Sequence, residues 1–100
     1  MDNYKDILEL TCKKEDIAQD LLKICPDLTP DENNTMALAI LCLDQIENHH
    51  NTDLVTSYIK YRSDFNDDEI RDMTNPDWLR GFIVFLSNKG SARQRERGHK

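Results

Sequence analysis

Residues 29–50 read TPDENNTMALAILCLDQIENHH, and this stretch decides the fold. Thr29 can cap a helix, Pro30 suits the first helical position, and Glu32 completes a capping box. The run MALAILCL is apolar throughout, and at about 100° per residue it surrounds a helix on every side. Such a run is far shorter than the roughly 20 apolar residues that span a bilayer. It therefore predicts a central helix over 30–48 that the rest of the chain covers.

The sequence before this stretch predicts helical structure that ends at Pro26, because proline keeps the preceding residue out of helical geometry. Apolar residues form a short helical pattern over 3–10 and recur at the spacing of one helix face over 12–25. Thr11 could cap a second helix there, so we expect either one long helix or two shorter ones. Lys14 falls on the outer, charged face of this pattern.

The sequence after the central helix contains three further helix starts. They predict helices over 53–62, about 67–73, and 76–88. Their capping residues are Thr52, Asn66 and Asn75. Gly90 is placed to end the last helix, and no side chain beyond it is both apolar and larger than alanine. We therefore expect an all-α fold, a compact bundle of five or six helices in one domain over 1–89, and a disordered basic tail over 90–100.

The charged residues are unevenly distributed along the chain. The formal net charge is −6, but residues 1–88 hold 8 Lys and Arg against 18 Asp and Glu. Residues 89–100 hold five basic residues against one acidic residue. An acidic body with a basic end indicates two surfaces that attract different partners.

The cysteines and the acidic residues do not predict a metal site. An odd number of cysteines and no visible secretory leader favour free thiols in a reducing, cytoplasmic compartment. These thiols, which we expect to be buried, are Cys12, Cys25 and Cys42. A calcium loop that begins at Asp64 fails, because Glu69 stands where the loop requires glycine and Asn75 where it requires glutamate. We predict no metal and no cofactor.

The sequence contains no catalytic motif. His49 and His50 fall in a polar turn without an evident partner, and none of the serines lies in a nucleophile motif. No apolar segment is long enough for a membrane helix. We predict a non-enzymatic protein with no membrane contact.

The aromatic residues of the last helix are the first candidate site. Trp78, Phe82 and Phe85 lie within about 60° of one another on a helical wheel. Aromatic clusters are favoured anchors at protein interfaces. The acidic segment before them contains Asp64, Asp67, Asp68, Glu69 and Asp72. Together they predict a surface that binds another protein. The oligomeric state is left open, with a homo-oligomer as one alternative. Small, acidic proteins without a catalytic motif often bind other proteins as inhibitors, adaptors or immunity factors. Phages and mobile elements often encode such regulators.

The basic end of the chain is the second candidate site. Its side chains suit phosphate contacts that carry no sequence specificity. They are Arg93, Arg95, Arg97 and Lys100. The alternative function is therefore an accessory nucleic-acid-associated protein, or a modulator of a nucleic-acid enzyme.

Overall fold

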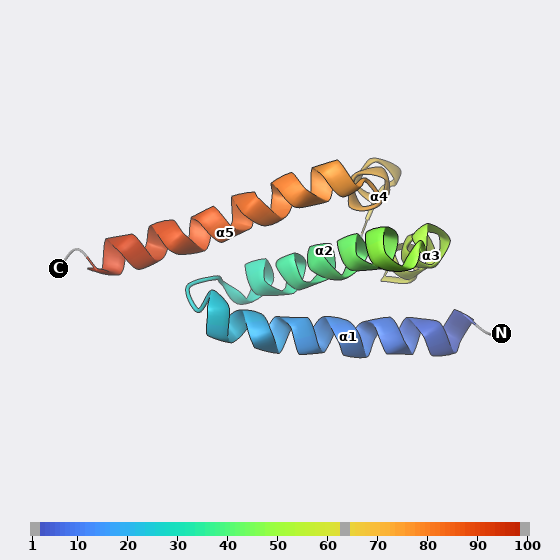
Figure 1. Ribbon diagram of the computed structural model, residues 1–100, viewed down its shortest axis with the longest axis horizontal. Coiled ribbons are helices and arrows are strands. Elements are labelled where there is room, and N and C mark those ends of the chain that lie inside the picture. The colour runs from blue at the N-terminus through green and yellow to red at the C-terminus, as the bar shows by residue number, and fades with distance from the viewer. Residues whose placement is uncertain (1–2, 63–64, 99–100) are drawn as a thin grey trace.

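The computed structural model describes residues 3–62 and 65–98, and all five elements in these ranges are α-helices. They are α1 (Asn3–Ile24), α2 (Pro30–His49), α3 (Thr52–Arg62), α4 (Asp67–Met73) and α5 (Pro76–Gly98). Figure 1 shows α2 between α1 and α5, with α3 and α4 together at one end. The most extensive helix contacts are those of α2 with α1 and with α5. The all-α class predicted from the sequence is confirmed.

The central helix α2 begins where its sequence predicts. Thr29 Oγ1 accepts a hydrogen bond from the Glu32 N–H at 3.1 Å, and Glu32 Oε1 accepts one from the Thr29 N–H at 2.9 Å. This capping box satisfies two backbone donors that the first helical turn leaves free. Most of the apolar run that follows is buried, namely Met36, Ala37, Leu38, Ala39, Leu41 and Cys42. Burial on several sides follows from the apolar circumference of the helix.

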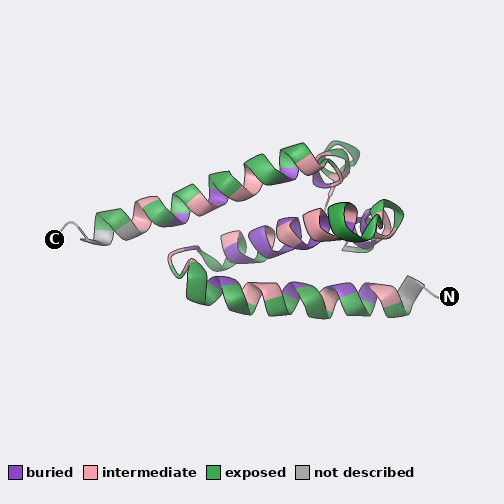
Figure 2. Ribbon diagram, viewed as in Figure 1, coloured by how far each residue is buried: buried purple, intermediate pink, exposed green. Residues whose placement is uncertain are grey.

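The buried residues lie on the helix faces that point toward one another (Figure 2), and they form two groups. The larger group joins all five helices and contains Leu41, Tyr58 and Leu79. The smaller group lies around the α1–α2 connection, where Leu28 and Leu86 are buried. Because α5 contributes to both groups, it packs along α2 over several turns.

The prediction that Lys14 lies on the outer, charged face of the first helix is wrong, because its side chain is buried. Its Nζ donates a hydrogen bond to Asn34 Oδ1 at 2.8 Å. The reason is that α1 is one continuous helix. In a continuous helix Lys14 falls on the same face as Ile7, Leu10 and Leu21, which contact α2 and α3. The apolar stem of the lysine packs on this face and its ammonium reaches a polar partner.

The cysteines differ from the expectation that all three thiols are buried. Cys42 is buried, and burial raises the pKa of its thiol to about 12. Cys25 is half-buried and Cys12 is exposed. All three are free thiols, as expected.

The C-terminal end also differs from the sequence prediction. Gly90 does not end α5, which continues as a helix to Gly98, and the disordered tail is therefore not confirmed. Gly90 is instead a packing residue, since a Cβ atom there would lie 3.3 Å from Leu28 Cδ2. Beyond it, Arg93 binds Glu32 and the Asp27 carbonyl. These contacts hold the final turns against the α1–α2 connection.

Candidate functional site

The predicted aromatic and acidic residues meet in a groove beside α4 and the start of α5. Its volume is about 360 Å³, and its lining is mostly apolar. The apolar wall is formed by Phe65, Met73, Trp78 and Phe82. Polar atoms come from Thr35 of α2 and from two carboxylates of α4, Glu69 and Asp72. We call this pocket the acidic groove.

Local hydrogen bonds place the groove residues of α4. Asn66 Oδ1 accepts from the Glu69 N–H at 2.8 Å, and Glu69 Oε1 accepts from the Asn66 N–H at 3.1 Å. This second capping box fixes the start of α4 and holds Glu69 at the groove. At the other end of α4, the Thr74 hydroxyl donates to the Ile70 carbonyl at 2.9 Å, which closes the last turn next to Met73.

The groove residues of α5 are positioned in the same way. Asn75 Oδ1 accepts from the backbone N–H groups of Asp77 and Trp78, at 3.0 and 3.4 Å. The cap starts α5 and puts Trp78 in its first turn. One turn later, Phe82 stacks on the indole with ring centroids 4.8 Å apart. Such a pair contributes about 0.5–1.5 kcal/mol beyond simple burial, so the aromatic wall is formed before any ligand arrives.

The three predicted aromatic residues differ in their accessibility. Trp78 is 37% exposed and Phe85 is 54% exposed, whereas Phe82 is half-buried against both groups of core residues. Phe85 does not line the groove. It lies under the ammonium of Lys89, whose Nζ is 5.0 Å from the ring centroid. The structure therefore brings Trp78 and Phe82 together and leaves Phe85 on the outer face of α5.

The predicted acidic residues also divide into two sets. Glu69 and Asp72 line the groove. Asp67 and Asp68 are exposed on the first turn of α4, and Asp68 forms an ion pair with Arg71. Asp64 lies outside the described residues.

Of the basic residues predicted to contact phosphate, the structure describes the side chains of two, Arg93 and Arg95. Arg93 is occupied within the chain, because it forms a bidentate ion pair with Glu32 and donates to the Asp27 carbonyl at 3.0 Å. Arg95 is exposed. The side chain of Arg97 and the whole of Lys100 lie outside what the structure describes.

Glu32 is the residue whose role the sequence analysis missed. Beyond its capping hydrogen bond, it accepts from Arg93, and Lys89 Nζ lies 3.8 Å from its Oε2. The Arg93 guanidinium, helped by the Thr29 N–H, lowers the pKa of this carboxyl to about 2. Its place three residues after Thr29 identified the cap, but no local pattern connects it to a residue 61 positions away.

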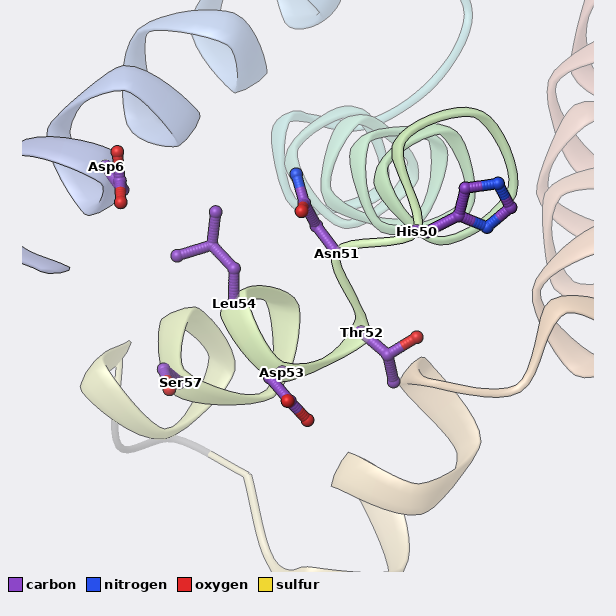
Figure 3. A pocket seen from close by; sticks show the side chains of 7 residues that line it. All are labelled: Asp6, His50, Asn51, Thr52, Asp53, Leu54 and Ser57. Atoms are coloured by element: carbon purple, nitrogen blue, oxygen red, sulfur yellow. The ribbon is translucent and has the colours of Figure 1, made fainter.

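A second pocket, of about 430 Å³, lies where α2 turns into α3 (Figure 3). It is lined by residues with acid, base and hydroxyl groups, among them Asp6, His50, Asp53 and Ser57. Figure 3 shows the imidazole of His50 pointing away from the other three. A nucleophile and its base must be within hydrogen-bonding reach, and the structure does not turn the His50 imidazole toward the Ser57 hydroxyl.

Within the described residues, no three His, Cys, Asp or Glu side chains gather closely enough to hold a metal ion. The described helices also include none with the length and apolar content needed to cross a membrane. Comparison with known proteins gives no matching family model, no similar curated protein and no similar solved structure.

Proposed function

We propose that the protein is a small, non-enzymatic regulator of the cytoplasm that works by binding another protein, as an inhibitor, adaptor or immunity factor. The observation that carries this proposal is the acidic groove. In it a preformed aromatic wall and two carboxylates face the same space.

The chemistry of the groove describes the partner segment. Apolar side chains of the partner bury against Trp78 and Phe82, and a single anchor of this kind can contribute 2 kcal/mol or more. A Lys or Arg beside the anchor would bind Glu69 or Asp72. The exposed acidic residues Asp67 and Asp68 add attraction for a basic partner, mainly by raising its association rate. The proposed ligand is thus a protein segment with an apolar anchor flanked by basic residues.

A peptide selection tests the proposal. Random peptides displayed on phage are selected on the protein, and the enriched sequences should combine a large apolar residue with Lys or Arg. Binding of the enriched peptides should weaken more than tenfold in Trp78→Ala and in Asp72→Asn. Tyr61→Ala is the matched control, because it removes a similarly exposed aromatic ring from α3, away from the groove, and should bind as the wild type does.

Two outcomes would contradict the proposal. In the first, the selected peptides bind the Trp78→Ala variant as tightly as they bind the wild type. The other is oligonucleotide binding that Arg95→Ala weakens while the groove variants keep it, which would favour the nucleic-acid alternative.

A further inference from the structure

The outer face of α5 carries exposed aromatic side chains around an exposed glycine. Trp78 and Phe85 lie on either side of Gly81 along the helix, and Val84 is exposed beside them. A Cβ atom at Gly81 would have no neighbour within 4 Å. Glycine within a helix is less favourable than alanine, so packing inside one chain gives no reason for it. If Gly81 is needed so that another group can approach the backbone closely, that group must come from another molecule.

The charges on both sides of this glycine are opposite in sign. Toward the start of α5 lie more acidic than basic residues: Asp68 and Asp77 each pair with an arginine of their own helix, and Asp72 adds to the negative charge. Toward its end, Arg95 is exposed, and Lys89 is exposed while it also pairs with Glu32. The order along the chain is therefore acidic, aromatic, glycine, aromatic, basic. If α5 of a second copy runs antiparallel to this α5, its order is reversed. The acidic end of each copy then faces the basic end of the other.

We infer that this face binds a second copy of the chain, with the two α5 helices antiparallel and crossing at Gly81. A two-fold axis between positions 81 and 82 places Trp78 opposite Phe85 of the partner subunit. It also brings the basic end of each α5 toward the acidic α4 of the other copy. The interface is isologous, so each favourable contact occurs twice. The absence of a side chain at Gly81 lets the two backbones approach closely.

The size of the face sets the strength of the dimer. One helix face with its neighbouring charges buries less than about 1,200 Å² in total, which is typical of weak association. The dimer should therefore dissociate on dilution through the micromolar range, and added salt should weaken it because its charges are exposed. The dimer does not depend on the proposed function, because Gly81 and Phe85 belong to the dimer face alone, whereas Trp78 and Asp72 belong both to that face and to the acidic groove.

Sedimentation equilibrium of the purified chain tests the inference. The wild type should double its mass as its concentration rises, and Trp78→Ala and Phe85→Ala should each weaken the dimer at least tenfold. Gly81→Gln should be monomeric while its helical circular dichroism and melting temperature stay at least at the wild-type level, because the new side chain meets nothing within the monomer. Tyr61→Ala, on α3, should dimerise as the wild type does. A wild type that stays monomeric throughout the micromolar range, or a Gly81→Gln variant that still dimerises, would overturn the inference.

A charge exchange tests the antiparallel arrangement. One variant carries Asp68→Lys with Asp72→Lys, and the other carries Lys89→Glu with Arg95→Glu. In the antiparallel dimer each variant sets like charges against each other twice, so neither should self-associate. Mixed together, they restore both attractive contacts and should form a heterodimer. If either variant still forms homodimers, or if the folded variants do not associate when mixed, the antiparallel arrangement is wrong.

Discussion

Gly81 and Gly90 of α5 allow the packing of this helix to be tested by one substitution at two sites. Gly81 is open, with no atom within 4 Å of a Cβ placed there, whereas a Cβ at Gly90 would lie 3.3 Å from Leu28 Cδ2. Alanine is more favourable than glycine in a helix by about 0.5–1 kcal/mol. Gly81→Ala should therefore raise the free energy of unfolding by that amount, or the melting temperature by a few degrees, since about 1 kcal/mol shifts a domain of this size by roughly 4–8 °C.

Gly90→Ala should not show the same gain. Carbon atoms pack best at about 3.5–4.0 Å, and Leu28 is buried, so it has little room to move away. Overpacking of this kind costs about 1–3 kcal/mol, which equals or exceeds the gain in helix propensity. We expect Gly90→Ala to lie between wild-type stability and about 2 kcal/mol below it.

Urea unfolding followed by circular dichroism measures both variants, at protein concentrations low enough for the chain to be monomeric. The informative quantity is the difference between the two alanine variants, because both change the same residue type in the same helix. Equal stabilisation by the two would show that Gly90 does not pack against Leu28. A destabilising Gly81→Ala would show that the outer face of α5 is not as open as the structure has it.

Three further predictions concern α2 and its cap. Leu41→Asp should remove the cooperative thermal transition, because it puts an unpaired charge at a site that is 1% exposed, at a cost of several kcal/mol; a near-native melting curve would refute the burial of α2. Thr29→Ala should lower the free energy of urea unfolding by about 1 kcal/mol through loss of the cap, and an unchanged value would mean that the helix starts elsewhere. The pKa of Glu32 is about 2 in the folded chain, below its ordinary value of 4.5, so the stability from its ionised form is complete above 4.5 and is lost as pH falls from there to about 2. Urea midpoints measured across this range should show the loss in the wild type and a smaller loss in Arg93→Ala, while identical pH profiles would mean that the ion pair contributes nothing to stability.

The starts of the helices could be predicted from the sequence because each depends on residues close together in the chain. The caps at Thr29 and Asn66 join a side chain to a backbone group three residues away, and both capping boxes are present as predicted. The burial of the middle of α2 was equally predictable, because an apolar residue at every position from 36 to 43 leaves no face there suited to water. Of the residues predicted to bind a protein, Trp78 and Phe82 lie beside carboxylates of α4, although no spacing rule said which carboxylates would line the groove. That these residues bind a partner stays a prediction.

Other features depended on contacts between distant parts of the chain. Lys14 looks like a surface residue by type, and only the continuity of α1 and the position of Asn34 on α2 explain its burial. The sequence after Gly90 resembles a disordered tail because it lacks apolar residues larger than alanine. Its Arg93 nevertheless forms an ion pair with Glu32, which lies 61 positions earlier in the chain. Glycine at 90 gave a local signal for a helix end, and its actual role is to make room for Leu28. Sequence patterns report interactions between residues that are close together in the chain. The distant residues that contact Lys14, Gly90 and Arg93 are determined by how the helices pack.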